Sequence, residues 1–182
     1  MGTEGAGASD APTTIASPAA LLARVEQVGI LVDDLEAAIE EHSATFGITR
    51  WRGYLYTADS VRDLTYRGAP ATLAFWVVLS DADPQIELIR SVRGPSIYTE
   101  WLEEHGHGVH HLGVFTRDLA GDVRRFGERG FDVLQSGHGY GLDGDGGFAY
   151  LDTFARLGVI VELVAVPARR RPPDREWVVS RG

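Results

Sequence analysis

The segment QVGILVDDLEAAI (27–39) returns in altered form as HLGVFTRDLAGDV (111–123), at an offset of 84 residues. The two copies share a glycine, an aspartate and a leucine at equivalent positions, with apolar residues between them. In each copy the apolar stretch is typical of a β-strand, and the aspartate can cap a following helix that ends at a glycine. The repeat therefore predicts a chain built from two related halves.

Each half continues with further β-rich segments. In the second half VELV (161–164) takes the place of IELI (86–89), and GFAYLDT (147–153) takes the place of TLAFWVVLS (72–80). The expected later strands of the first half lie near residues 53–58, 72–80 and 85–91, the last two joined by the turn-forming DADP. The predicted fold class is therefore α+β, with two paired βαβββ modules forming a cupped mixed sheet.

These patterns divide the chain into five segments. The first is rich in Gly, Ala, Ser, Thr and Pro and cannot bury enough apolar surface to order itself, and the last is interpreted as a solvated terminus. The predicted segments are a disordered tail (1–20), a first βαβββ module (21–92), a linker helix (93–108), a second βαβββ module (109–168) and a C-terminal tail (169–182). Within the second module, the glycine-rich stretch 136–148 is interpreted as either a lid or a flexible turn.

Composition excludes several classes of function. The chain of 182 residues contains no cysteine, which excludes disulfides and thiolate chemistry, and no lysine, which excludes Schiff-base catalysis. The net charge of −9 argues against nucleic acid or an anionic membrane as partner. No apolar run approaches the length of a membrane span, and the N-terminus lacks the pattern of a signal peptide. We therefore expect a cytoplasmic protein.

Four polar side chains stand at repeat-equivalent positions. Successive residues of a strand alternate between its two faces, so the repeat predicts which side chains share a surface. Gln27 and His111 lie in the first strand of each half and face away from the apolar residues that pack on the helices. Glu87 and Glu162 do the same in the last strand of each half. The four groups are thus expected to converge on the concave face of the sheet.

The region 105–111 holds four of the six histidines of the chain. Because strand residues alternate, His110 is expected to point to the face opposite His111. His105 and His107 are expected to be loop residues or to lie around the site without entering it.

Over roughly residues 24–166 the chain resembles the vicinal oxygen chelate superfamily, which includes glyoxalase I and methylmalonyl-CoA epimerase. The segment SIYTEWLEEHGHGVHHLGV (96–114) is especially similar to the linker and second-module start of the epimerases. In this family each module donates two ligands, from its first and last strands, to one divalent ion inside the cupped sheet. The resemblance also implies a homodimer. The metal ligands that it implies are Gln27, Glu87, His111 and Glu162.

The chain departs from the epimerase pattern. Epimerases of the family usually have His where Gln27 stands and often Gln where Glu87 stands, so this set is closer to that of animal glyoxalase I. The separate glutamate base of the epimerases has no counterpart in TLAFWVVLS (72–80). Three arginines are unassigned candidates for an anionic substrate, with solvated surface as the favoured interpretation: Arg52, Arg62 and Arg67.

The implied ligand set has a definite chemistry. One amide oxygen, two carboxylates and one imidazole suit Zn, Co, Mn, Ni or Mg, and they leave two positions of an octahedron open to adjacent substrate oxygens. Such an ion would acidify the proton on the carbon that those oxygens share. Glu162 or Glu87 is then expected to act as the base, and His138 and Tyr140 in the glycine-rich stretch are expected to contact the substrate.

The sequence therefore favours a divalent-metal-dependent isomerase or epimerase that acts on a small molecule with vicinal oxygens. A glyoxalase I-type lyase is the closest alternative. A non-catalytic protein that binds a small molecule, such as a drug, is the alternative from another class, and such proteins generally lack the four ligands.

Overall fold

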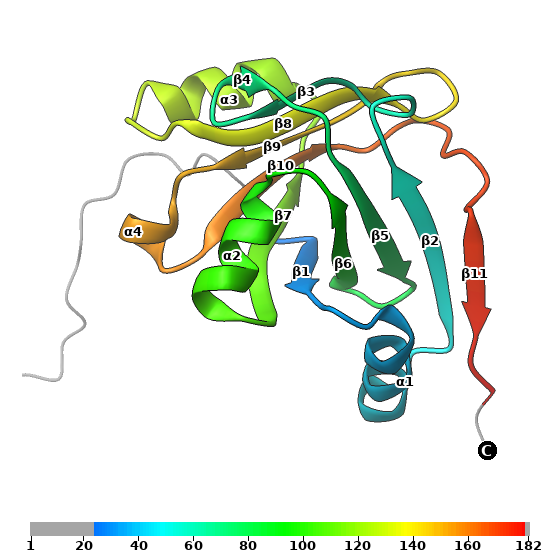
Figure 1. Ribbon diagram of the computed structural model, residues 1–182. Coiled ribbons are helices and arrows are strands. Elements are labelled where there is room, and N and C mark those ends of the chain that lie inside the picture. The colour runs from blue at the N-terminus through cyan, green and yellow to red at the C-terminus, as the bar shows by residue number, and fades with distance from the viewer. Residues whose placement is uncertain (1–23, 181–182) are drawn as a thin grey trace, which may run out of the picture.

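The computed structural model describes residues 24–180. Within this range the strands form one 11-stranded sheet, which curls into a half-barrel with helices on its outside and at one end (Figure 1). The predicted tail, residues 1–20, lies outside the described residues. No helix in the described part of the chain is long and apolar enough to cross a membrane.

The two halves fold as the duplicated βαβββ modules that the repeat predicts. The first consists of β1 (Gln27–Leu31), α1 (Leu35–Phe46), β2 (Arg50–Tyr56), β5 (Ala74–Ser80) and β6 (Gln85–Arg93). The second consists of β7 (Gly108–Phe115), α3 (Leu119–Gly127), β8 (Val133–Tyr140), β9 (Gly146–Leu151) and β10 (Ile160–Ala165). The sheet order β2-β5-β6-β1 is followed by β7-β10-β9-β8, so the modules meet at the antiparallel pair β1 and β7. One chain therefore completes one cup, by which we mean the space on the concave face of the sheet.

The two shared aspartates begin the outer helices. The side chain of Asp34 accepts a hydrogen bond from the Ala37 amide at the start of α1, and Asp118 accepts one from the Gly121 amide at the start of α3, each at 3.0 Å. These bonds satisfy amides that the first turn of a helix leaves without a partner. The repeat thus fixes where each helix leaves its strand.

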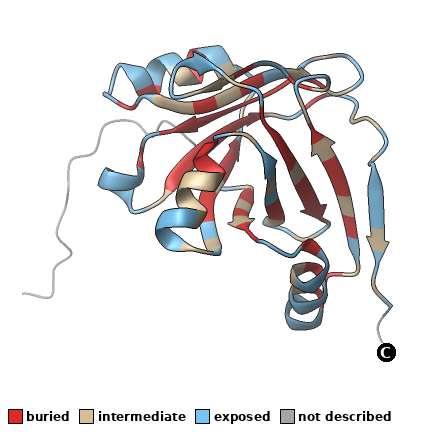
Figure 2. Cartoon of the chain, in the orientation of Figure 1, coloured by how far each residue is buried: buried red, intermediate tan, exposed pale blue. Residues whose placement is uncertain are grey.

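Strand alternation sorts the side chains between the two faces of the sheet. On the outer face, α1 packs on one apolar cluster that includes Trp51 and Leu88, and α3 packs on another that includes Leu151 and Leu163. The inner face carries a third cluster, rich in tyrosine and phenylalanine. Figure 2 shows the central strands as mostly buried and the outer sides of the helices as mostly exposed. Both faces of the central sheet are therefore covered.

Two short helices connect strands of the sheet: α2 lies between β6 and β7, and α4 lies between β9 and β10. A capping box of Ser96 and Thr99 begins α2 (Ile97–His105), which places Tyr98 in the inner cluster, fully buried. The other helix, α4 (Phe154–Leu157), leads into β10. Trp101 of α2 packs edge-on against Phe154, with ring centroids 5.2 Å apart. The predicted linker thus contributes side chains to the cup.

Three strands were not predicted from the sequence. The strands β3 (Arg62–Tyr66) and β4 (Ala69–Pro70) leave the first module and extend the sheet beyond β8 of the second. The strand β11 (Arg175–Val178) pairs with β2 of the first module. Most residues of β11 are exposed, but the C-terminal segment is more than a solvated terminus, because its backbone pairs with β2 at the sheet edge and Trp177 packs on the first module. The glycine-rich stretch 136–148 is mostly the hairpin of β8 and β9.

Candidate metal centre

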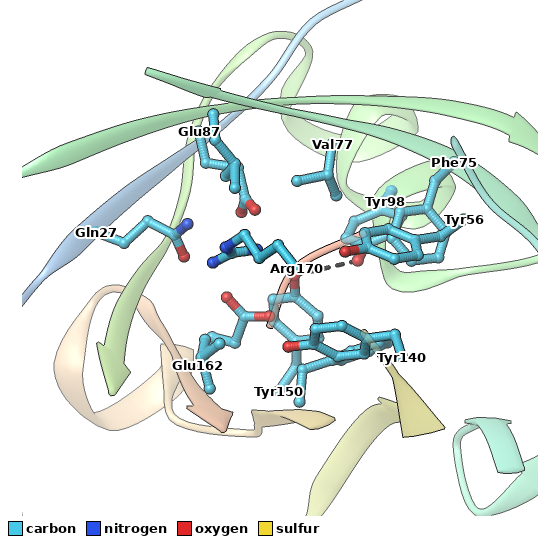
Figure 3. Close-up of a pocket in the computed structure, with 13 residues that line it drawn as sticks. Gln27, Tyr56, Phe75, Val77, Glu87, Tyr98, Tyr140, Tyr150, Glu162 and Arg170 are labelled. Atoms are coloured by element: carbon cyan, nitrogen blue, oxygen red, sulfur yellow. Dashed lines mark hydrogen bonds between the residues drawn. The ribbon is translucent and has the colours of Figure 1, made fainter. Parts of the chain in front are cut away.

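The four repeat-equivalent polar side chains meet on the inner face of the sheet. Gln27, Glu87, His111 and Glu162 are between 0% and 6% exposed. The Nε2 atom of His111 lies 3.1 Å from an oxygen of Glu87 and 3.0 Å from an oxygen of Glu162. In Figure 3 the Gln27 amide faces the same space, with Glu87 and Glu162 approaching it from opposite sides. The structure thus brings all four predicted ligands together.

The two glycines of the repeat make room for these ligands. In the antiparallel pair of β1 and β7, Gly29 lies opposite His111 and Gly113 lies opposite Gln27. A Cβ atom at position 29 would overlap the imidazole of His111, and one at position 113 would lie 2.6 Å from the Gln27 side-chain oxygen. Each module therefore leaves a gap in its first strand for the ligand of the other module.

We expect Gly29→Ala to weaken binding of Co²⁺ by roughly 10- to 100-fold, the scale for loss of a group that orients a ligand. The added methyl group must displace the His111 ring from a buried site, which also costs about 1–3 kcal/mol of stability. Visible absorption of bound Co²⁺ and thermal unfolding measure the two effects. The control is Gly127→Ala, where a Cβ would meet nothing within 4 Å, so unchanged Co²⁺ affinity is expected. Equal affinity in both variants would contradict the assigned role of Gly29.

Strand alternation predicts that His110 points to the face opposite His111, but the structure places it differently. The register of β1 and β7 shifts so that Gly29 pairs with His111 and Ile30 pairs with Val109, which leaves His110 as an extra residue in a β-bulge. Its ring is fully buried against Trp101, and the Nδ1 atoms of His110 and His111 lie 3.1 Å apart. One ring must donate to the other in this contact. The bond therefore fixes the orientation of His111.

The Gln27 side chain is oriented in a similar way. Its Nε2 donates to the side-chain oxygen of Gln85 at 3.0 Å, and Gln85 in turn donates to the carbonyl of Ser80 at 3.2 Å. With its nitrogen held by Gln85, the Gln27 amide presents its oxygen to the cup. Partners that orient ligands in this way are a regular feature of metal sites.

The ionisable side chains of the centre shift one another's pKa values. Burial lowers the pKa of His111, but the carboxylates of Glu162 and Glu87 outweigh this effect and raise it to about 9. Burial also raises the pKa of Glu87, against the opposing effect of His111. Burial lowers the pKa of His110 well below its usual range, so that ring is neutral. Without a metal, His111 is the cation between the two glutamates, and a metal ion must displace its proton.

The buried polar atoms of the site fit a divalent cation. One side-chain atom of each predicted ligand is buried without a hydrogen bond, and the His111 atom among them contacts the two glutamate atoms only as ion pairs: Gln27 Oε1, Glu87 Oε2, His111 Nε2 and Glu162 Oε2. Buried polar atoms are nearly always hydrogen-bonded, so four convergent exceptions need an explanation. Ligand atoms of Glu87, His111 and Glu162 all lie within 4.8 Å of one another. This buried group can therefore hold a metal, and the Gln27 oxygen is placed to complete it.

The walls of the pocket around this centre are aromatic and aliphatic. Its volume is about 40 Å³. Among the described residues that line it, Glu87 and Glu162 are the only carboxylates. The other lining residues are Gln27, Tyr56, Phe75, Val77, Leu79, Tyr98, Tyr140, Phe148, Tyr150, Val164 and Arg170. The pocket thus excludes most water and supplies no acidic side chain besides the two predicted ligands.

Of the two residues predicted to contact the substrate, only Tyr140 lines the pocket. Its hydroxyl donates to the carbonyls of Gly147 and Ala165, each at 3.2 Å. His138 is exposed on β8 and does not line the pocket. Residues 138 and 140 would share a face in a regular strand, but an irregularity in the pairing with β9 lies between them and separates their side chains.

The other basic residues considered from the sequence also lie outside the pocket. His105 stacks on Trp101, His107 contacts Asp33 on the surface, and Arg67 pairs with Glu100. Neither Arg52 nor Arg62 lines the pocket.

The arginine that enters the pocket is Arg170, which the sequence alone assigned to a C-terminal tail. Its only signal in the sequence is the run ARRRPPD (168–174), which does not show which of three arginines faces inward.

Comparisons with known proteins agree with this geometry. A protein-family model described as Glyoxalase/Bleomycin resistance protein/Dioxygenase superfamily matches residues 26–150. No curated protein gives a significant match. A hypothetical protein from Bacillus halodurans aligns with a TM-score of 0.60 at 14% identity, covering 81% of this chain and 97% of that chain. This likeness supports the fold alone.

Methylmalonyl-CoA epimerases are also among the similar structures. The enzyme from Mycobacterium tuberculosis aligns with a TM-score of 0.56 at 22% identity, covering 84% of this chain and 94% of that chain. A variant of the Streptomyces coelicolor enzyme, solved in complex with 2-nitronate-propionyl-CoA, aligns with a TM-score of 0.52 at 26% identity. That alignment covers 83% of this chain and 99% of the other.

Proposed function

Because this chain belongs to the glyoxalase/bleomycin resistance protein/dioxygenase superfamily, also called the vicinal oxygen chelate superfamily, we propose that it is a divalent-metal-dependent isomerase or epimerase. In this proposal, the enzyme removes a proton from the carbon next to a carbonyl of a small substrate. The observation that carries the proposal is the set of four buried ligand atoms that converge on the inner face of the sheet without hydrogen bonds. A protein that only binds an apolar molecule would have no use for two buried carboxylates there.

The proposed metal ligands are Gln27, Glu87, His111 and Glu162. An ion held by them would supply Lewis-acid polarisation of the substrate carbonyl, which acidifies the neighbouring C–H bond. Zn, Co, Mn, Ni and Mg all suit a set of three oxygens and one imidazole nitrogen. The aromatic walls would exclude water, which strengthens every charge interaction inside the pocket.

We assign the removal and return of the substrate proton to the two glutamates, Glu87 and Glu162. Glu162 comes from β10 and Glu87 from β6, and Figure 3 shows them on opposite sides of the pocket. One carboxylate can therefore remove a proton from one face of a carbon while the other returns it to the opposite face, as epimerisation requires. A base held within about 3 Å of the proton gains from this positioning. In this proposal Tyr140, which lines the pocket, contacts the substrate, whereas His138, which is exposed outside the pocket, would do so only if the substrate extended beyond it.

A glyoxalase I-type lyase is the second candidate. It is favoured by the identity of the ligands, because Gln27 and Glu87 occupy positions where epimerases of the family usually have other residues. The two candidates differ in the substrate carbon from which the proton leaves. A 2-methyl-malonyl thioester reports on the epimerase, and the hemithioacetal of a 2-oxoaldehyde reports on the lyase.

The experiment follows deuterium entry at the acidic carbon of each substrate in deuterated water. Protein stripped with a chelator is compared with protein reloaded with one equivalent of Co²⁺, Zn²⁺, Mn²⁺, Ni²⁺ or Mg²⁺. We expect exchange only in the reloaded samples and one ion per chain by metal analysis. Absence of both metal binding and exchange would favour the non-catalytic small-molecule-binding protein. The homodimer and the cytoplasmic location implied by the resemblance and the sequence stay predictions.

A further inference from the structure

The pocket around the centre has little free space. Its volume of about 40 Å³ accommodates only a few water molecules, because one water needs roughly 10–15 Å³. Pockets that bind small molecules usually measure about 300–1,000 Å³. Part of the pocket wall must therefore move before such a molecule can enter.

One segment of the wall is better suited to move than the rest. All but one of the described residues that line the pocket lie in strands of the sheet or in α2. The exception is Arg170, which lies in the segment between β10 and β11, and Figure 3 shows its side chain among those around the pocket. Residues 166–174 contain no helix or strand. This part of the wall can therefore move without breaking the central sheet.

We call residues 166–179 the C-terminal strap, because they connect the two modules across the cup. The strap leaves the second module after Ala165 and ends with β11, which pairs with β2 at the edge of the first module (Figure 1). Between these two attachments it carries Arg170 into the lining of the pocket. The strap thus has one end on each module and its middle over the pocket.

The end of the strap near β10 is attached to the second module. The Leu142 amide donates to the Arg169 carbonyl, and the Ala168 amide donates to the Asp145 side chain, each at 2.9 Å. Arg169 also forms an ion pair with Asp143. These contacts lie close to the covalent connection with β10, so this end is the natural hinge.

The other end is attached to β2 by groups that are mostly exposed. The Leu55 amide donates to the Asp174 side chain at 2.7 Å, and the Asp174 amide donates to the Gly53 carbonyl at 2.9 Å. Asp174 also pairs with Arg171. Of the four residues of β11, only Trp177 is even partly buried. Exposed ion pairs contribute little to stability, and segments with few buried contacts open more readily than the core. Separation of β11 from β2 is therefore the least costly way to open the wall.

We propose that the C-terminal strap is a lid, which opens when β11 separates from β2 and the strap swings about the residues after Ala165. The proposal goes beyond the proposed function, because it rests on the volume and lining of the pocket and not on the chemistry performed there. In the closed form described here, Arg170 completes the wall. In the open form, the pocket is accessible to its ligand.

A reversible clamp on the full chain tests the lid. Arg52 and Glu176 lie opposite each other in the antiparallel pair of β2 and β11. Such residues are about 4.5–5.5 Å apart, a spacing that a disulfide can span. The chain contains no cysteine, so the double variant Arg52→Cys, Glu176→Cys can form only this bond within one chain.

The probe is Co²⁺, and its uptake is followed by visible absorption after rapid mixing. We expect the oxidised clamp to take up Co²⁺ roughly 30-fold more slowly or worse, the scale on which a disulfide stabilises the linked form. The final amount of bound Co²⁺ should not change, and a phosphine reductant should restore the wild-type rate. Glu176→Cys alone, treated with the same oxidant, is the matched control and should behave like the wild type.

Asp174→Ala should have the opposite effect. It removes the acceptor of the Leu55 amide and the partner of Arg171. We expect Co²⁺ uptake to become about 2- to 10-fold faster, the range for one lost hydrogen bond. Asp33→Ala is the control, because it removes a surface carboxylate that pairs with His107 and not with the strap, and it should take up Co²⁺ at the wild-type rate.

Hydrogen exchange measures the opening without any metal. The amides of Asp174 and Val179 are bonded to carbonyls of the first module, those of Gly53 and Thr49. We expect residues 174–179 to exchange on the order of 100-fold faster than β10, because local opening needs less free energy than global unfolding. The oxidised clamp should slow this exchange, and Asp174→Ala should speed it.

The outcomes separate this proposal from the proposed function. If the oxidised clamp takes up Co²⁺ at the wild-type rate, the lid is wrong and the metal site stands. If the disulfide does not form, unchanged uptake and exchange in Asp174→Ala overturn the lid. If the wild-type protein binds no Co²⁺, the proposed function fails and hydrogen exchange decides on the lid. Protection of residues 174–179 equal to that of β10 would then overturn it, whereas faster exchange that the clamp suppresses would support it.

Discussion

Glu162→Gln is expected to slow deuterium entry at the acidic carbon of the substrate by about 100-fold or more, the usual scale for a lost general base. Glu162 lies in the wall of the pocket, 4% exposed, and its Oε2 atom lies 3.0 Å from the Nε2 atom of His111. The glutamine keeps an oxygen that can bind the metal but cannot take up a proton. The rate should therefore fall while the metal stays bound. Proton NMR of the substrate and metal analysis of the same sample measure the two quantities.

Glu87→Gln is the informative comparison, because Glu87 holds the repeat-equivalent position on β6. If the enzyme moves a proton between opposite faces, both variants should be slow. If the enzyme acts on one face of the carbon only, just one of the two variants should be slow. Glu128→Gln, on the exposed end of α3, is the control and should exchange like the wild type. Unimpaired exchange in both site variants, with metal retained, would exclude both glutamates as the base and would point to Tyr140, since His138 is exposed outside the pocket.

His111→Ala is expected to lower Co²⁺ affinity by more than about 100-fold. Loss of a residue that only orients a ligand costs about 10- to 100-fold, so loss of the ligand should cost more. The change also leaves Glu87 and Glu162 buried together without a cation, which destabilises the fold. Metal analysis after dialysis and a Co²⁺ titration measure the effect, and circular dichroism checks that the variant is folded.

Two further variants keep this test decisive. His111→Gln retains a polar side chain in case the alanine variant does not fold, and it should still bind Co²⁺ far more weakly than the wild type. His138→Ala removes an exposed histidine from β8 and should have no effect. Full metal occupancy in both His111 variants would remove His111 from the site and contradict the equivalence between His111 and Gln27.

Much of the centre could be predicted from the sequence because it depends on local rules. The repeat aligned Gln27 with His111, and the period of two residues in a strand then placed both on the inner face. The same rule placed Glu87 and Glu162, since the apolar residues beside them must pack on the helices. The two-residue period failed for His110, because a β-bulge inserts one residue into β7 and no local sequence pattern indicates this bulge.

The features that the sequence did not show depend on contacts between distant residues. Thr65 of β3 bonds Ser136 of β8 across 71 positions, and the pairing of β11 with β2 spans a still longer separation. Neither segment alternates polar and apolar residues strongly enough to be predicted as a strand. The position of Arg170 in the pocket could not be predicted for the same reason. Its position over the pocket depends on where β11 is anchored, not on its neighbours in the chain.

The exchange of edge strands has a consequence for folding. The first half supplies β3 and β4 to the edge of the second, and the end of the chain returns β11 to the edge of the first. The bond between Leu55 and Asp174, for example, closes a loop of 119 positions. Such long-range contacts form late and slow the folding of a chain. Neither half can reach its full sheet without the other, so we expect the two modules to unfold together in one cooperative transition, despite their origin as a repeat.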